Sequence, residues 1–410
     1  MTDTENQPAE GPLHGVTVCD FTHGVAGPYT AMLLADLGAD VWKIEKPGRG
    51  DATRYMNVSR RFRGDIPNAG GDYFLAINRN KRSVALDLKS DSGKELALRL
   101  AASADIVLSN FRPGVMDSLG LGYDSIRELN PRVIYASLSA YGEKGPLAAH
   151  PGMDVAVQAR SGVMSITGYG GMDPIKPGVS LADFSGGSHL TTAVLAALYQ
   201  RERTGVGQRV TLSLLEATMS MLINYSVAVV DGDAVIDPMG SGHPQLVPFQ
   251  AFPTSDGYVV IATGTNRLFA DLCDVLSLTG VKDDPRFVTN VVRVENRAEL
   301  IPLIEEVTRT RTTAAWLAIF EANGIPCAPV NTMAQALNDP QMVANDGIVE
   351  VEHPSVGKVH VLASPYHLSE ASTAVRRPPP MLGEHTAEIL REVLGVETGA
   401  YAELQPQEVV

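Results

Sequence analysis

Along the first half of the chain, short apolar runs alternate with segments whose apolar residues recur at helical spacing. Residues 15–22 and 40–45 have the apolar character of buried strands, and residues 29–37 between them have helical periodicity. The alternation continues to residue 230, with strands expected at residues 83–88, 105–109, 133–140 and 208–212 and helices at 92–102, 122–129 and 214–227. Strands that alternate with helices predict a mostly parallel, doubly wound α/β sheet.

The pattern changes after residue 230. Residues 231–248 are rich in Gly, Pro and Asp, which is typical of an irregular linker. Residues 250–264 then predict two strands around a turn at Asp256 and Gly257. The helices expected after this turn lie at residues 267–276, 297–308, 313–323 and 333–337. We therefore expect a second, α+β unit before the chain returns to strands near residue 349 and ends in a helix at 386–394.

The composition indicates a globular protein. Its 410 residues are 44% hydrophobic and 20% charged, which is enough chain for about two domains with a large core. The net charge of −14 argues against nucleic acid as a partner. The three cysteines are far apart and lack the spacing of metal ligands, so we expect reduced thiols, no metal site and a cytoplasmic protein. No apolar run approaches the roughly 20 residues of a membrane span.

One carboxylate stands close to a glycine pair and a helical pattern. In the stretch GVSLADFSGGSHL, from residue 178, Asp183 precedes Gly186 and Gly187, and apolar residues at helical spacing follow. An Asp at the start of a helix lies near free backbone N–H groups, and glycines allow a ligand to approach the backbone. The alternative is a plain N-cap, in which Asp183 closes the helix and nothing reacts. On this stretch alone the cap is the simpler interpretation.

From about residue 13 to residue 395 the chain resembles the class III coenzyme A transferases, which include formyl-CoA transferase. The resemblance rests on blocks in the family's order: DFTHGVAGPYTAMLLADLGADVWKIEKPGRGD, NRNKRSVALDLK, NFRPGVMDSLGLGYD, LADFSGGSHL, TGVGQRV, GIPCAPV and PPPMLGEHT. The α-methylacyl-CoA racemases share the fold and most of these blocks. Fold and CoA binding therefore follow from the resemblance more directly than the type of reaction.

The resemblance implies a particular architecture. Family members have a large Rossmann-like domain built from the N-terminal half and the C-terminal segment, and a smaller domain joined by two linkers. Each subunit forms a ring, and two rings interlock as a homodimer. Together with the pattern above, we expect for this chain a disordered N-terminus (1–12), the first part of the CoA-binding domain (13–230), a linker (231–248), a small α+β domain (249–335) and a linker with the return to the large domain (336–410).

The resemblance also implies the chemistry. Asp183 aligns with the family's catalytic aspartate, which forms an aspartyl anhydride and then an aspartyl-CoA thioester while CoA passes between two carboxylic acids. In the racemases, a His immediately before the Asp of an earlier block acts as a second acid/base. Here that position is Met153, which cannot transfer a proton, so the transferase is favoured. We interpret the neighbouring Asp154 as a structural N-cap of the helix that runs towards Gly162.

A glycine-rich loop at residues 239–245, MGSGHPQ, aligns with the loop that covers the aspartyl intermediates in the transferases. The resemblance implies that Gly240 and Gly242 supply flexibility and N–H donors for an oxyanion. The loop is shorter and poorer in glycine than in the formyl-CoA transferases, and an ordinary linker turn is the alternative. His243 is either a partner for an acceptor carboxylate or a structural histidine.

Coenzyme A needs a slot for adenine and cations for its phosphates, and it serves as a substrate, with no tightly bound cofactor expected. The contacts carried over from the family are Val25, Ala26, Lys46, Leu86, Lys89, Asn110, Phe111 and Arg112. The basic residues among them suit phosphates, and solvated surface charge is the alternative. Val25 replaces a Gln of formyl-CoA transferase, which argues against formate or oxalate as substrate.

The acyl substrate is indicated only by a basic loop. Arg60, Arg61 and Arg63 are candidates to bind the second carboxylate of a dicarboxylic acid such as succinate, or else are solvated. The sequence thus predicts a CoA transferase that takes CoA from an acyl-CoA such as succinyl-CoA to a carboxylic acid. The alternatives are a 2-methylacyl-CoA racemase or epimerase and a non-catalytic acyl-CoA-binding protein.

Overall fold

The computed structural model describes residues 10–59, 61 and 70–396. These residues form two compact units. The first contains the described residues up to Val163, Lys176–Asp233 and those from Val343 on, and the second contains Met164–Ile175 and Ala234–Met342. The predicted disorder at residues 1–12 concerns mainly residues 1–9, which lie outside the described residues.

The first unit is built on a parallel sheet in the order β3-β2-β1-β4-β5-β6. Its strands are β1 (Thr17–Asp20), β2 (Asp40–Glu45), β3 (Lys81–Ala85), β4 (Ile106–Ser109), β5 (Ile134–Ser139) and β6 (Gln208–Ser213). Neighbouring strands pair in parallel, for example Val18 beside Val41 on one side and Ile106 on the other. This confirms the predicted parallel α/β sheet. Strands β2 and β3 are added on one side of β1, and β4 to β6 are added on the other side. In folds of this kind, ligands bind at the carboxyl ends of the strands where this order switches, here between β1 and β4.

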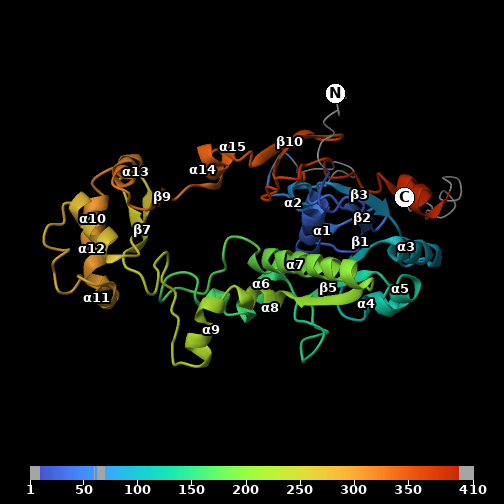
Figure 1. The fold of residues 1–410 in the computed structure, drawn as a ribbon, viewed down its shortest axis with the longest axis horizontal. Helices are drawn as coiled ribbons and strands as arrows, with labels where there is room; N and C mark the ends of the chain where they lie inside the picture. Colours follow the sequence, from blue (N-terminus) through green and yellow to red (C-terminus); the bar gives the residue numbers. More distant parts are fainter. Residues whose placement is uncertain (1–9, 60, 62–69, 397–410) are drawn as a thin grey trace. The chain divides into compact units, whose positions relative to one another are not determined.

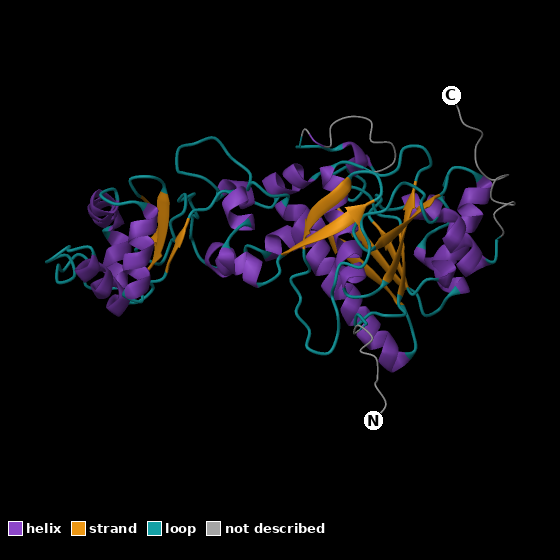
Figure 2. Cartoon of the chain, turned by 90° about the horizontal axis from the view of Figure 1, so that it is seen from above, coloured by secondary structure: helices purple, strands orange, loops and turns teal. Residues whose placement is uncertain are grey.

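Helices cover both faces of the sheet (Figure 2). They are α1 (Ala26–Asp36), α2 (Asp72–Ile77), α3 (Asp91–Ser103), α4 (Val115–Ser118), α5 (Tyr123–Leu129), α6 (Asp154–Arg160), α7 (Leu181–Thr204), α8 (Leu214–Ser220), α9 (Ile223–Val230) and α16 (Thr386–Leu394). Two short 3-10 helices, η1 (Ala52–Tyr55) and η3 (Val163–Ser165), and a hairpin of β10 (Ile348–His353) and β11 (Gly357–Leu362) complete the list, with α15 (Pro340–Ala344) crossing the boundary between the units.

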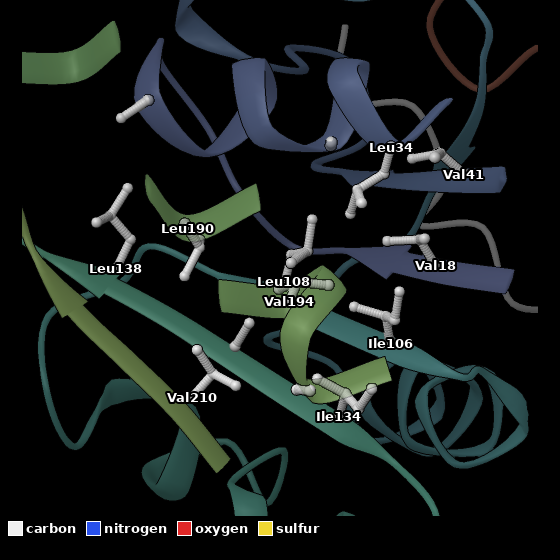
Figure 3. Close-up of a cluster of buried hydrophobic side chains, with 14 of the residues drawn as sticks. Val18, Leu34, Val41, Ile106, Leu108, Ile134, Leu138, Leu190, Val194 and Val210 are labelled. Atoms are coloured by element: carbon white, nitrogen blue, oxygen red, sulfur yellow. The ribbon is translucent and has the colours of Figure 1, made fainter. Parts of the chain in front are cut away.

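Alternation along the strands divides the core into two layers. Val18 of β1 points into the layer that contains Leu34 of α1 and Leu190 of α7, as Figure 3 shows. Its neighbour Cys19 points to the other face, into the layer that contains Leu100 of α3. Because successive strand residues face opposite sides, an apolar run buries both faces of the sheet. The pair α1 and α7 therefore covers one face (Figure 1).

The second unit is a small antiparallel sheet with helices. Its strands are β7 (Phe249–Pro253), β8 (Tyr258–Ala262) and β9 (Cys327–Pro329), in the order β7-β8-β9. Its helices are α10 (Asn266–Val275), α11 (Asn290–Glu295), α12 (Arg297–Thr308), α13 (Thr313–Ala322) and α14 (Met333–Leu337). Residues 164–175, which the sequence placed within 13–230, belong to this unit, where the backbone of Tyr169 bridges to that of Met239.

Several element boundaries differ from the sequence prediction. The helix expected over residues 214–227 is broken into α8 and α9, because Met221 and Leu222 bond three residues back in a tight turn. The third strand begins at Lys81, two residues earlier than predicted, and ends at Ala85. The boundary with consequences for function is that of α7, which begins at Leu181 and so includes Asp183 in its first turn.

Candidate functional site

A cavity of about 380 Å³ opens at the carboxyl ends of β1, β2, β3 and β4. Its walls are mostly apolar, with polar and charged side chains at intervals, and the lining residues are Phe21, Thr22, His23, Lys43, Ile44, Glu45, Lys46, Gly50, Asp51, Leu86, Asp87, Leu88, Lys89, Phe111, Val115 and Leu119. Lys46 and Lys89 are exposed, whereas Leu86 is buried. The cavity therefore offers a ligand mostly apolar walls, with two exposed ammonium groups, those of Lys46 and Lys89, among its lining residues.

The eight predicted CoA contacts do not all lie on this cavity. Lys46, Leu86, Lys89 and Phe111 line it. Arg112 instead lines a smaller cavity of about 30 Å³, which it shares with Phe111. The other three predicted contacts belong to the loop that ends at α1 and to its anchor: Val25 is the N-cap of α1, Ala26 is its first residue, and Asn110 holds the loop from β4.

Asn110 fixes this first loop through the backbone of His23. Its Oδ1 accepts the His23 N–H at 2.9 Å, and its Nδ2 donates to the His23 carbonyl at 2.7 Å. The His23 ring lies against Phe111, with the ring centroids 4.9 Å apart. On the other side of the loop, the Asp51 carboxylate accepts the N–H of Gly24 at 3.2 Å. The predicted role of Asn110 as a ligand contact is thus accompanied by a structural one.

Beneath the cavity lies a group of buried charges that the sequence analysis missed. Lys43 Nζ contacts Asp51 at 2.9 Å and donates to the Thr22 carbonyl at 3.0 Å. Burial opposes ionisation of Asp51, but the Lys43 charge and the hydrogen bonds overcome it and hold the pKa of Asp51 well below its usual range. Burial lowers the pKa of Lys81 to about 7, against the opposing charge of Asp20. The available signal was Lys43 between the apolar residues Trp42 and Ile44 of a strand predicted to be buried.

Asp183 does not cap its helix. It is the third residue of α7, whose N-cap residue is Ser180, and Ser180 makes no side-chain hydrogen bond to the first turn. The cap comes from Asp154, whose Oδ1 accepts the N–H groups of Ala182 at 2.9 Å and Asp183 at 3.3 Å. The interpretation of Asp154 as the N-cap of its own helix is therefore wrong, because Met153 holds that position and Asp154 caps α7.

The Asp183 carboxylate is half-buried and poorly accommodated as an anion. Among the residues that the structure describes, none donates a hydrogen bond to this carboxylate. Burial, and then the negative charge of Asp154, raise the pKa of Asp183 to about 7. A carboxyl group with so perturbed a pKa is typical of a functional site.

The glycine pair in α7 serves packing between helices. A Cβ at Gly186 would stand 2.4 Å from the Leu214 side chain, and one at Gly187 would stand 2.8 Å from both the Ala26 carbonyl and the Tyr29 ring. Both glycines lie in the second turn of α7, where Gly186 lets the helix approach α8 and Gly187 lets it approach α1, so packing alone accounts for them without a ligand. The helix of Asp183 is thereby joined to the helix that follows the first loop.

The loop with Gly240 and Gly242 belongs to the second unit. Gly240 has a φ of +62°, and a Cβ there would overlap the Tyr169 ring, so this position requires glycine. Gly242 donates its N–H to the Met239 carbonyl at 3.0 Å. His243 Nδ1 accepts the Gln245 N–H, and its carbonyl accepts from Arg297. Within this unit the loop is a structured turn.

The basic loop does not offer Arg61 to a substrate in this structure. Its Nη2 donates to the carbonyls of Val356 and Lys358, at the turn between β10 and β11. Arg60 and Arg63 lie outside the described residues. Across the described ranges, no cluster of three or more His, Cys, Asp or Glu side chains is placed to hold a metal ion. Likewise, no helix in the described part of the chain is long and apolar enough to cross a membrane.

Comparison with known proteins places this geometry in a family. The profile described as CoA-transferase family III matches residues 13–386. The human protein named succinyl-CoA:glutarate CoA-transferase is 38% identical over 97% of this chain and 90% of its own length. A formyl-CoA:oxalate CoA-transferase of Rhodopseudomonas palustris is 36% identical over 96% of each chain. Among solved structures, a CAIB/BAIF family protein from Brucella suis matches with a TM-score of 0.83 and 35% identity, covering 94% of this chain and 100% of its own. The chain therefore belongs to CoA-transferase family III.

Proposed function

We propose that this protein moves CoA from an acyl-CoA donor to a carboxylic acid acceptor through a covalent intermediate on Asp183. The observation that carries the proposal is the state of this side chain. Asp154 performs the capping that Asp183 would otherwise perform, so the Asp183 carboxylate is left without a described hydrogen-bond donor. A pKa of about 7 means that a large fraction is ionised at neutral pH, while the anion is basic and weakly solvated.

The proposed reaction has four steps. An Asp183 oxygen attacks the thioester carbonyl carbon of the donor. The C–S bond breaks, CoA thiolate departs, and a mixed anhydride between Asp183 and the donor acid is formed. The thiolate attacks the carboxyl carbon of Asp183, so the donor acid departs as its carboxylate and an aspartyl-CoA thioester forms. The acceptor carboxylate attacks the same carbon and again expels CoA thiolate. The thiolate then attacks the acceptor's carbonyl carbon, which yields the new acyl-CoA and restores Asp183.

The cavity at the carboxyl ends of β1 to β4 is the proposed CoA site. Its apolar walls, which include Leu86 and Phe111, suit the adenine ring. Lys46 and Lys89, exposed beside the cavity, suit the phosphates as charge-assisted partners. The first loop, pinned by Asn110 and Asp51, would offer the backbone of Val25 and Ala26 to the ligand. Arg112 extends the basic surface next to Phe111.

We propose dicarboxylic acids as the acyl substrates, with succinyl-CoA as donor and glutarate as acceptor. The support is the naming of relatives: besides the human protein, one from Agrobacterium fabrum at 35% identity is named succinate--glutarate CoA-transferase. A racemase reaction is disfavoured by Met153, which is 70% exposed directly before Asp154 and offers no base. A purely binding function would give no role to the perturbed carboxyl group of Asp183.

Two further features belong to this proposal. For the loop with Gly240 and Gly242, the cover over the aspartyl intermediates stays a prediction from the resemblance. The interlocked homodimer expected from the resemblance is supported by α9, of which no residue is buried although it reads INYSVAVV. Ile223, Val227 and Val230 are each at least 70% exposed, a degree of apolar exposure that indicates an interface. A folded 43.7 kDa monomer in light scattering on dilution would contradict the interlocked dimer.

The function is tested by exchange. The protein is incubated with succinyl-CoA and glutarate, and with a panel of other carboxylic acids, and the CoA products are identified by mass. The proposal predicts glutaryl-CoA from the unchanged protein and none from Asp183→Asn, with CoA binding retained in both. Asp124→Asn, which makes the same change in the first turn of α5, is the matched control. Equal product from Asp183→Asn and the control would refute the proposal.

A further inference from the structure

The N-terminus of α7, the helix that carries Asp183, is capped by Asp154 of α6. The first N–H groups of any helix lack partners within it and need acceptors from elsewhere. In α7 two of these groups, at Ala182 and Asp183, donate to Oδ1 of Asp154 at 2.9 and 3.3 Å. One of the two N–H groups is the backbone of the nucleophile itself. Asp154 thus holds the main chain of the nucleophile and leaves its side chain unengaged.

The second oxygen of Asp154 is fixed as well. Gln158, one turn along α6, donates from Nε2 to Asp154 Oδ2 at 2.7 Å and to the Val179 carbonyl at 3.3 Å. Gln158 is fully buried, so its amide group has little freedom. Three N–H groups therefore converge on Asp154, which is the setting that an acceptor-only carboxylate requires.

We propose that Asp154 is a positioning residue for the nucleophile: it fixes the backbone of Asp183 and keeps a negative charge near the Asp183 carboxylate, which sets the pH at which that carboxylate becomes available. The inference rests on the proposed function, because Asp154 can position a nucleophile only if Asp183 is that nucleophile. Two carboxylates close together resist simultaneous ionisation, and the second to ionise is the more basic. Burial first, and then Asp154, raise the pKa of Asp183 to about 7, in agreement with this arrangement.

The other titratable groups around α7 have partners of their own. In α1 the Tyr29 ring packs against Phe184, and within α7 His189 contacts the Ser185 carbonyl and Ser220. On neighbouring elements, Asp36 of α1 pairs with Arg79, Arg160 of α6 lies near Tyr141, and Glu216 of α8 accepts from Ser213. Tyr135 of β5 donates to the Leu121 carbonyl, and Arg209 of β6 pairs with Glu143. The charge that acts on Asp183 is that of Asp154.

Asp154→Asn separates the charge from the cap. Its Oδ1 keeps the lone pairs that accept the two N–H groups of α7, while the negative charge is lost. The new Nδ2 group takes the place of the Oδ2 acceptor beside Gln158, whose Oε1 has no partner among the described residues and is the nearby acceptor available to it. Asp154→Ser removes the charge in a second way with a smaller acceptor. Asp154→Ala removes both charge and cap.

The readout is the titration of Asp183 itself, without substrate. In protein labelled with ¹³C at the Asp carboxyl carbon, the signal of Asp183 is assigned by its loss in Asp183→Asn. We expect a midpoint near pH 7 in the unchanged protein. In Asp154→Asn and Asp154→Ser we expect it to fall by about one pH unit, with the acid limb of the transfer rate moving equally. Asp124→Asn is the control and should leave the midpoint unchanged.

The outcomes are distinguishable. A midpoint in Asp154→Asn and Asp154→Ser equal to that of the unchanged protein overturns the inference, as does a loss of rate that is the same at every pH and the same for Asn and Ala. Failure of the proposed function would appear differently, as the absence of CoA transfer by the unchanged protein. The titration of Asp183 would then still decide whether Asp154 controls its ionisation.

Discussion

Replacing Asp183 by Asn should make the protein more stable. The substitution keeps the size of the side chain and removes a charge that is half-buried and has no described hydrogen-bond donor. A residue that is held ready to react is expected to cost stability, because the fold supplies none of the contacts that would satisfy it. If Asp183 were a helix cap, Asn would be nearly neutral, since Asn and Asp cap about equally well.

The magnitude follows from the pKa of Asp183. It rises from an ordinary 3.8 to about 7 in the folded protein. In that interval the folded state binds the proton and the unfolded state does not, so stability falls as pH rises, by about 1.4 kcal/mol per pH unit, and levels off above pH ~7. The full difference is about 4 kcal/mol, and partial exposure to solvent reduces it to about 2–4 kcal/mol. Asp183→Asn should regain this amount at neutral and alkaline pH and progressively less as the pH falls.

The assay is urea unfolding of the first unit. Trp42 is buried in β2, and the other tryptophan, Trp316, lies in the second unit, so a Trp316→Phe background makes the fluorescence report on the first unit. The gain in unfolding free energy of Asp183→Asn should grow by about 1–2 kcal/mol between about pH 5.5 and pH 8. A gain that does not change with pH, or a loss of stability, would refute the reasoning.

Three further substitutions test the structure around the site. Lys43→Met should cost about 3–5 kcal/mol of unfolding free energy, because Asp51 is left as an unpaired buried charge, and adding Asp51→Asn should recover part of the loss in a double-mutant cycle. Asn110→Ala removes two hydrogen bonds to the first loop and should weaken CoA binding, measured by calorimetry, by about 1–3 kcal/mol. Unchanged affinity would show that the first loop does not contribute to CoA binding. Gly187→Ala should destabilise by about 1–3 kcal/mol through overlap with α1, while Gly178→Ala, which meets no atom within 4 Å, should be tolerated; equal melting of the two variants would contradict the packing role.

The sheet was predictable because its strands carry their own signal. Runs such as residues 15–22 are apolar on both sides, and a run of this kind can be buried only in a sheet that is covered on both faces. The carboxyl ends of those strands are where a binding site is expected, and four of the predicted CoA contacts, Lys46, Leu86, Lys89 and Phe111, line one cavity there. Arg112, which is adjacent in sequence, turns to a second cavity, and a motif alone does not reveal this direction.

The contact between Asp154 and Asp183 was not predictable from local patterns. Asp154 and Asp183 are separated by a segment that joins the second unit, and their contact depends on how α6 packs against α7. From sequence, each Asp was compared with a cap of its own helix, because local rules describe caps within a few residues. Likewise, the sequence of the glycine pair is the same whether it contacts a ligand or packs against a helix. Only the positions of Ala26, Tyr29 and Leu214 in the structure show that the pair packs against helices.

The central claim is that the Asp183 carboxylate becomes covalently attached during transfer. The most direct measurement is to mix the protein with succinyl-CoA, quench in acid, digest, and search by mass spectrometry for a modified peptide containing Asp183, with a parallel sample treated with hydroxylamine. The account predicts an acyl or CoA adduct on Asp183, its conversion to the hydroxamate, and no adduct in Asp183→Asn. Transfer that proceeds at full rate with Asp183 unmodified, or an adduct on another residue, would contradict it.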